Sequence, residues 1–471
     1  MDGWCYGRAY ETMFAIPGVA CLIVFILARP QEFIPLLQKV PFLHLFTALC
    51  ALGWIIDIRL RRLQPTGTPA LPWAIAFLAW AIVSTAVVVP DLLISKGIEM
   101  AILFALYGTI AHGIQRFRTF QAVAGVLVLT CLFITFVCFH QGLSPTQCVG
   151  GEEIEGEING KPDGRYCETV DRCYAPDAEP GLEYRCEHVG LFGTYSVQQR
   201  IRYRGELQDP NEVSLAMTAG ALSLLIAFAR RKRSPMATTA CIAGIALVLF
   251  TVVLSQSRGG LLSALLVFGV YVVRRFGLWT MIPAGALALP VLLLGGRSGG
   301  AADVSTQLRY EAWSTGLTLF KQYPLFGVGP GQFAEHHFLT AHNSFVLTMT
   351  ELGFIGMFLF TSMLYVTVKS LIVGIRDLAK VPGAESAQVW GMALLASMAA
   401  ILFQINTLSF AYHSVLWIFL GLCGAWSGAI RHHMPDFKVR MSWKEVVIVA
   451  VGCVAFIVFV LPVFLKYKGE L

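Results

Sequence analysis

The chain has 471 residues, of which 56% are hydrophobic and 14% are charged, with a net charge of +6 and a mean hydropathy of +0.66. So large an apolar fraction cannot be enclosed in one water-soluble core, which excludes an ordinary soluble protein. The cationic residues cluster between apolar stretches, so the positive charge indicates membrane topology and not nucleic-acid binding.

Apolar stretches long enough to cross a bilayer recur along the whole chain. A membrane-spanning helix needs about 20 mostly apolar residues. About thirteen stretches qualify, near 12–28, 40–58, 70–89, 92–111, 119–140, 212–229, 236–255, 259–273, 277–294, 344–368, 388–408, 411–430 and 445–465. We therefore expect an all-α membrane protein with about 12–13 transmembrane helices. The first stretch lacks an early basic region and a small-residue cleavage site, so we expect a retained helix and not a signal peptide.

Two long polar segments divide these stretches into regions. We expect N-terminal spans over 1–140, an acidic, cysteine-containing outer loop over 141–211, and a transmembrane core over 212–430. The core includes a second long outer loop at 295–343, and 431–471 holds the last span.

Clusters of Lys and Arg set the orientation, because they stay on the cytoplasmic side. If the N-terminus is cytoplasmic, six clusters follow an even number of crossings, at 59–62, 115–118, 230–233, 274–275, 369–380 and 431–444. Both long loops and the "SQSRGG" turn at 255–260 then lie outside. Arg258, Arg309 and His342 therefore face one compartment.

The first outer loop carries four of the twelve cysteines, Cys148, Cys167, Cys173 and Cys186. An even set outside the cytoplasm predicts two disulfides, whose pairing the sequence leaves open. A four-cysteine zinc site is the alternative, but paired CxxC knuckles are absent. The loop is also rich in Asp and Glu, which either keep it soluble or bind a cation, and we favour solubility.

Three arginines, Arg200, Arg202 and Arg204, follow the acidic loop in "QQRIRYRGELQDPN". Alternate residues of an extended segment share one side. The three suit either the phosphate of an anionic ligand, which Arg holds in a bidentate fork, or pairing with the acidic loop. Asp209, followed by Pro210, is predicted to N-cap the next helix.

Arg258, in "VLSQSRGGLLSALLVF", is a sharper candidate for a binding role. It lies between two apolar stretches, at or just below the outer membrane face. An ionisable residue at such depth is costly and marks a site or an ion pair. The two glycines after it let the backbone turn closely and leave room for a ligand.

The second outer loop contains "LRYEAWSTGLTLF", whose apolar residues recur at helical spacing. This pattern predicts an amphipathic helix along the membrane surface, with Arg309 and Trp313 on one face. The "GVGPG" that follows lacks the Lys-Ser/Thr of a phosphate-binding P-loop, so we expect a tight turn. His336, His337 and His342 come next without an HExxH pattern, which disfavours a metal site.

These landmarks resemble the bacterial O-antigen ligase and O-antigen polymerase superfamily. The pair His342 and Asn343, nine intervening residues, then Gly353 and Gly356 are similar to its signature. "SRGG", "LRYEAW…PLFGVGPGQF" and "GELQDPN" are similar to further landmarks of the superfamily in the same order. The resemblance covers roughly residues 200 to 425.

The resemblance implies a multi-pass glycosyltransferase of the bacterial inner membrane whose active site faces the periplasm. Its donor would be a glycan linked to undecaprenyl diphosphate. The acceptor would be a lipid A core sugar, as in the ligases of lipopolysaccharide synthesis, or another carrier-linked repeat, as in the polymerases. Some relatives glycosylate proteins. No cofactor and no metal are implied, and direct displacement would invert the anomeric configuration.

The chemistry assigns roles to the matching residues. A diphosphate leaving group gains negative charge, which fixed cations stabilise, so Arg258 and Arg309 are expected to bind the diphosphate, with Arg204 a weaker third. A neutral imidazole suits removal of the acceptor proton, so His342 is expected to be the catalytic base. Asn343 and His413 are reserve candidates.

Three further residues are expected to support the site. Gly353 and Gly356 are predicted to let a neighbouring helix or a lipid tail approach closely. Glu351 is predicted to be a buried hydrogen-bonding partner and not the base.

Departures from the superfamily pattern leave the acceptor open, because the acidic loop and the extra span are not shared. A polysaccharide transporter or flippase is the rival class. It would need polar residues along a path through several spans, and Lys96, Glu99 and Glu351 are the prominent candidates.

Overall fold

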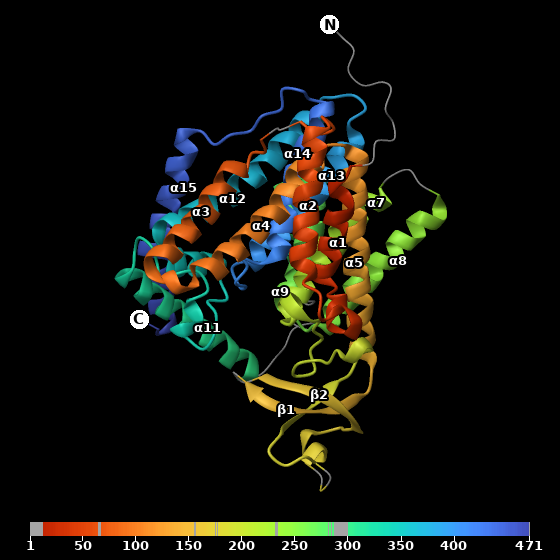
Figure 1. Cartoon of the computed structure of the whole chain (residues 1–471), viewed down its shortest axis with the longest axis vertical. Coiled ribbons are helices and arrows are strands. Elements are labelled where there is room, and N and C mark those ends of the chain that lie inside the picture. The colour runs from red at the N-terminus through yellow and green to blue at the C-terminus, as the bar shows by residue number, and fades with distance from the viewer. Residues whose placement is uncertain are drawn as a thin grey trace.

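The computed structural model describes residues 13–64, 67–154, 157–174, 176, 178–230, 234–280, 282–283, 285–286 and 300–470. Most of the apolar stretch expected at 277–294 lies outside these residues. A bundle of helices forms the body of the protein, and a small sheet projects from one end of it (Figure 1). We call this end the sheet end.

Helices and strands follow the apolar pattern of the sequence. Before the sheet come α1 (Ala15–Leu27), α2 (Phe42–Arg59), α3 (Leu71–Val88), α4 (Leu93–Gly113) and α5 (Phe117–Leu143). The strands are β1 (Thr146–Ile154), β2 (Glu157–Tyr166) and β3 (Glu183–His188). After the sheet come α6 (Pro210–Met217), α7 (Ser223–Ala229), α8 (Pro235–Leu254), α9 (Arg258–Phe276), α11 (Gly300–Gln322), α12 (Ser344–Leu378), α13 (Glu385–Gln404), α14 (Ser414–Ala429), α15 (Trp443–Ala455) and α16 (Leu461–Lys468).

Eleven helices in the described part of the chain are long and apolar enough to cross a membrane. Two of these spans are built from helix pairs, because π-helical turns at Thr218–Leu222 and Phe456–Val460 join α6 to α7 and α15 to α16. The expected stretch at 12–28 forms α1, whose 13 residues fall short of a full crossing. The prediction of an all-α membrane protein is confirmed, and the described part of the chain holds eleven candidate spans where about 12–13 were expected.

The centre of the bundle is α14. In its candidate span 89% of the residues are buried, against 17% for α2 and 22% for the last span, α15 and α16. Apolar side chains on α2 and on the last span are therefore left to face lipid, as a membrane-spanning bundle requires. The enclosed α14 packs against α4 and α13.

The first outer loop contains an element that the sequence analysis did not predict. Its three strands form an antiparallel sheet in the order β2-β1-β3. Two disulfides, Cys148–Cys173 and Cys167–Cys186, link the sheet to the segment between β2 and β3. We call the sheet and this segment, residues 146–188, the disulfide head. Its acidic composition obscured the strands, because cross-linking replaces the large apolar core that strand patterns normally reveal.

Candidate functional site

Four of the spans that begin at the sheet end have a side-chain cap. Asp209 caps α6 in a capping box with Glu212, Ser257 caps α9, Asn343 caps α12 and His413 caps α14. The predicted cap at Asp209 is confirmed. Helix N-termini carry partial positive charge and uncommitted N–H groups, which favour anions. Positive helix ends therefore gather on one side of the bundle.

The starts of α6 and α9 are joined directly. Ser257 Oγ donates to Asn211 Oδ1 at 2.6 Å and accepts from the Gly260 N–H at 2.9 Å. A Cβ added at Gly260 would lie 2.4 Å from Ser214 Oγ, so only glycine allows this approach. Arg258, the first residue of α9, is exposed beside this junction.

The predicted amphipathic helix is α11, which lies in the second outer loop and carries Arg309 and Trp313. The Trp313 indole N–H donates to the Ala341 carbonyl at 2.8 Å, so α11 fixes the residue immediately before His342. Ser314 Oγ donates to the Glu470 carbonyl at 2.8 Å, and Phe464 packs on Tyr310 and Trp313. The last span therefore ends at the sheet end, against α11.

The backbone of His342 adopts the left-handed conformation, with φ 44°. This region is uncommon for a residue with a Cβ and persists only where surrounding contacts hold it. The His342 N–H donates to Ser409 Oγ at 3.0 Å. On the other side, Asn343 accepts the N–H groups of Phe345 and Val346 at 2.9 and 3.1 Å. The imidazole is thus carried on a strained backbone that is anchored on both sides.

Electrostatic interactions connect His342 with Arg309 and Asp209. Burial and the neighbouring Arg309 guanidinium lower the pKa of His342 to about 4, although Asp209 acts in the opposite direction. Burial likewise lowers the pKa of Arg309, with Asp209 again opposing. The free site therefore holds a neutral imidazole beside a cation at physiological pH, and that cation is balanced by the α6 cap residue.

Helix α12 is broken one residue after Leu352. Gly353 has φ 67° and ψ −166°, and a Cβ added there would lie 2.2 Å from the Leu325 carbonyl oxygen. The Phe354 N–H donates to the Pro324 carbonyl at 2.9 Å. Gly353 thus allows close approach, as predicted, but the approaching group is the backbone of the preceding loop and not a helix or a lipid tail. The Cβ of Gly356 would meet Leu352 of the same helix.

The "GVGPG" segment follows Pro324 and Leu325 and runs beside the last residues before this break, and Gly327, Gly329 and Gly331 all have positive φ. The predicted tight turn is confirmed. The Gly329 N–H donates to the Glu351 carbonyl at 2.9 Å, and the Glu351 carboxylate accepts the Phe333 N–H at 3.2 Å. Glu351 is 2% exposed. It is therefore the buried hydrogen-bonding partner that the sequence indicated.

Arg204 and His413 contact groups other than His342. Arg204 donates to the Phe192 and Glu32 carbonyls. His413 Nδ1 accepts the Val415 N–H at 3.2 Å, and its Nε2 lies 2.8 Å from the Glu206 carbonyl oxygen. Burial lowers the pKa of His413, although Glu206 opposes the shift. His413 therefore acts as a helix cap in this fold.

Two residues of the site were missed as site residues by sequence reasoning. Asp209 was predicted only as a cap, yet its charge also acts on Arg309 and His342. Ser409, in the loop between α13 and α14 and 67 residues away in the sequence, accepts the His342 N–H and so helps to hold the strained backbone. No local pattern marks a serine at such separation, whereas the acidic cap beside three arginines was a usable signal for Asp209.

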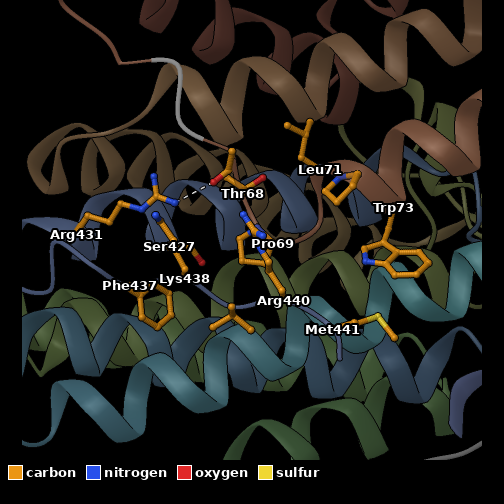
Figure 2. A pocket seen from close by; sticks show the side chains of 13 residues that line it. Thr68, Pro69, Leu71, Trp73, Ser427, Arg431, Phe437, Lys438, Arg440 and Met441 are labelled. Carbon is orange, nitrogen blue, oxygen red and sulfur yellow. Dashed lines mark hydrogen bonds between the residues drawn. The ribbon is translucent and has the colours of Figure 1, made fainter. Parts of the chain in front are cut away.

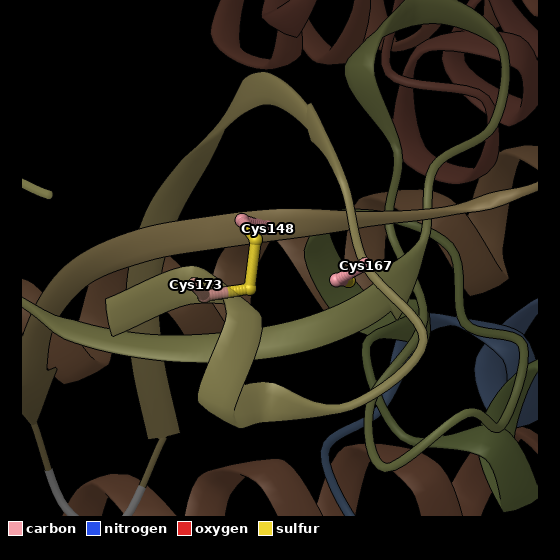
Figure 3. Close-up of side chains that lie close together, drawn as sticks. All are labelled: Cys148, Cys167 and Cys173. Atoms are coloured by element: carbon pink, nitrogen blue, oxygen red, sulfur yellow. A yellow bond between two sulfur atoms is a disulfide. The ribbon is translucent and has the colours of Figure 1, made fainter. Parts of the chain in front are cut away.

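Among the described residues, the potential metal-ligand atoms that lie close together are the sulfurs of Cys148, Cys167 and Cys173, within 4.8 Å of one another. Figure 3 shows that the sulfur atoms of Cys148 and Cys173 are bonded, and Cys167 is bonded to Cys186. Thiolates are the metal ligands, so disulfide sulfurs do not form a metal site. His337 Nδ1 instead accepts the Leu339 N–H at 3.0 Å.

The fold defines a multi-pass membrane protein, and Arg258, Arg309 and several helix N-termini lie toward the sheet end of its bundle. Residues 243–361 match the O-antigen ligase (Wzy_C) family model. This segment is therefore similar to an O-antigen ligase domain, which agrees with the resemblance in the sequence and suggests a membrane glycosyltransferase-like function. The matched segment includes Arg258, Arg309 and His342. A search of curated proteins found no match.

Proposed function

We propose that the protein is a periplasmic-face glycosyltransferase of the bacterial inner membrane. It moves a glycan from undecaprenyl diphosphate to an acceptor sugar, in the manner of an O-antigen ligase. The observation that carries this proposal is the strained, anchored His342 beside Arg309. An imidazole held neutral next to a fixed cation suits a reaction that removes a proton while an anion leaves.

The donor diphosphate binds to the cations and helix ends of the site. Arg309 and Arg258 are its main ligands, and the adjoining N-termini of α6 and α9 add partial positive charge. This charge is in place before reaction, so it stabilises the developing leaving group without reorganisation. Arg204 is a third cation, and because it already donates to two carbonyls its loss also loosens the loop that it holds.

His342 accepts the acceptor proton during transfer. The acceptor hydroxyl oxygen bonds to the anomeric carbon, the bond from that carbon to the diphosphate oxygen breaks, and the hydroxyl proton moves to the imidazole. Undecaprenyl diphosphate leaves with the electron pair, and the anomeric configuration inverts. The bound diphosphate also favours the protonated imidazole, so donor binding raises the basicity of His342 at the moment when it is needed.

The membrane position of the site suits an amphiphilic donor. The site residues lie at the ends of spans, so a lipid tail can remain in the bilayer while its diphosphate reaches Arg309. The disulfide head is tied to the same region through the segment that follows it. Glu187 of the head accepts the Gln199 N–H at 2.8 Å, and the next residue, Arg200, donates through Nε to the Ser255 carbonyl at 3.2 Å in the turn before Arg258. Disulfides belong to an oxidising compartment, which supports a periplasmic location for this end.

The acceptor distinguishes the remaining alternatives. The disulfide head stands where an acceptor must approach, and it suits a repeat-unit polymerase or a protein O-oligosaccharyltransferase as well as a lipid A core ligase. A transporter or flippase would need a polar path, but Lys96 and Glu99 form a partly exposed ion pair at 2.9 Å and Glu351 bonds the Phe333 N–H. These contacts favour the enzyme.

The test is glycan transfer by the purified protein from undecaprenyl diphosphate-linked glycan. Lipid A core and a second carrier-linked glycan are offered together as acceptors, with His342→Asn as the control because asparagine tolerates the left-handed backbone. Product on lipid A core supports the ligase, and chain growth on the carrier identifies a polymerase. Transfer that survives the substitution would refute the assignment of the base.

A further inference from the structure

A cavity of about 560 Å³ lies at the other end of the bundle from His342. It is bounded by the start of α3, the end of α14 and the segment that leads into α15. Its volume is within the range of small-molecule sites, roughly 300–1,000 Å³. Part of its wall, Arg431 and Phe437–Met441, belongs to the basic cluster at 431–444, which is one of the clusters that indicate the cytoplasmic side.

The charge of the cavity wall is of one sign. Thirteen residues line it, and they include Arg431, Lys438 and Arg440 but no carboxylate. Three cations around one half-open cavity repel one another, and an anion bound between them relieves this repulsion. The wall therefore suits an anionic group.

Neighbouring contacts hold this basic wall in place. Arg431 Nη2 donates to the Gly67 carbonyl at 2.9 Å, which ties the end of α14 to the loop before α3. Phe437 and Val439 are buried while Lys438 and Arg440 are exposed, as alternation along an extended segment produces. Lys369 Nζ donates to the Arg440 carbonyl at 2.9 Å. The basic side chains thus project from an anchored segment and not from a loose tail.

The rest of the cavity is apolar and lies at the membrane boundary. Figure 2 shows Arg431, Ser427 and Thr68 together on one side, with Trp73 and Met441 on the other. Candidate spans begin at Leu71 and Trp443 and end at His432, which places the cavity at the level of the lipid headgroups. Tryptophan favours this interface. A ligand with a phosphate at one end and an apolar body at the other matches both sides.

We propose that this cavity binds the phosphate group of an anionic phospholipid from the cytoplasmic leaflet. The three cations hold the phosphate, and the side with Trp73 and Met441 receives the glycerol and the first part of an acyl chain. Basic pockets between transmembrane helices bind anionic headgroups in this way. The site is separate from the glycosyl-transfer chemistry, so its ligand does not depend on the activity assigned to His342.

Binding of lipid to the purified full-length protein tests this inference. The probes are phosphatidylglycerol and phosphatidylcholine with the same acyl chains, and inorganic phosphate, each titrated into detergent-solubilised protein. The test variant is Arg431→Gln, Lys438→Gln, Arg440→Gln. The matched control, Arg59→Gln, Arg275→Gln, Lys380→Gln, removes the same charge from the same membrane side but from residues that do not line the cavity.

We expect phosphatidylglycerol to bind the wild-type protein and the control alike, and the test variant about tenfold or more weakly. A third variant, Arg431→Lys, Lys438→Arg, Arg440→Lys, keeps the charges and should retain binding, which separates loss of charge from misfolding. Equal binding of phosphatidylcholine, or an equal loss in the control, would overturn the proposal. Saturable binding of inorganic phosphate that competes with phosphatidylglycerol and matches its affinity would instead identify a free-phosphate site.

Discussion

The acid limb of the pH–rate profile tests the role of His342 most directly. Burial and Arg309 lower the pKa of this imidazole from an ordinary 6.5 to about 4. At pH 5.5 an imidazole with a pKa of 4 is about 97% neutral, whereas one with a pKa of 6.5 is about 9% neutral. We therefore expect kcat/KM for glycan transfer to remain level from pH 8 to about 5.5 and to fall only as the pH approaches 4.

Removing the neighbouring charge should move this limb. In Arg309→Gln the guanidinium no longer opposes protonation, so the pKa of His342 should rise and the acid limb should shift to higher pH. The shift should be partial, because burial is the larger cause and remains. Arg309→Lys keeps the charge and is the matched control, whose limb should stay near that of the wild type.

Donor binding should act in the same direction as Arg309→Gln. An anionic diphosphate beside His342 favours the imidazolium, so the acid limb of kcat should lie at higher pH than that of kcat/KM. The assay is initial-rate transfer from undecaprenyl diphosphate-linked glycan between about pH 3.5 and 8, with protein integrity checked at each pH. A wild-type limb of kcat/KM near pH 6.5, or an unmoved limb in Arg309→Gln, would refute this account of the site.

The remaining predictions concern the backbone and the disulfide head. His342→Asn should abolish transfer and keep the wild-type melting temperature. His342→Val should abolish transfer and also lower the stability of the fold by about 1–2 kcal/mol, because a β-branched residue disfavours positive φ. Equal melting temperatures of the two variants would contradict the backbone strain at His342. Gly353→Ala should prevent normal folding, because its Cβ would collide with the Leu325 carbonyl. Gly452→Ala should be tolerated, because no other atom lies within 4 Å of a Cβ placed there. The yield of detergent-soluble protein on size-exclusion chromatography compares the two variants. Cys148→Ser removes a disulfide that spans 25 residues and should lower the stability of the disulfide head by about 3 kcal/mol. Limited proteolysis should then cut within residues 146–188 faster than in the wild type. Unchanged digestion would contradict a stabilising role for this disulfide.

Local sequence patterns predicted the positions of most helices and of several turns and caps. The lengths of the apolar stretches located the spans, because a helix that crosses a membrane must form all its backbone hydrogen bonds internally and present apolar side chains to the lipid. The cap at Asp209 and the turns of "GVGPG" were predictable because their interactions lie within a few residues. The arginines and His342 were identified as candidates by type, position and family resemblance.

Tertiary contacts decided the features that give those candidates their chemistry. The left-handed backbone of His342 depends on Ser409, and the break in α12 depends on the loop at Pro324 and Leu325. The Ser84 hydroxyl, which donates to the Phe326 carbonyl at 2.7 Å across 242 residues, helps to fix that loop. No local propensity encodes such distant pairings.

The sequence by itself therefore determined the class of protein and the approximate positions of its spans, and it supplied the candidate residues for catalysis, because length, apolarity and charge act locally. Only the tertiary structure decided that the first outer loop contains a sheet, that His413 is a helix cap, and that Arg309 and Asp209 act on His342. The reason is physical: a pKa, a strained dihedral angle and a cross-linked sheet depend on neighbours that the fold brings together from distant parts of the chain.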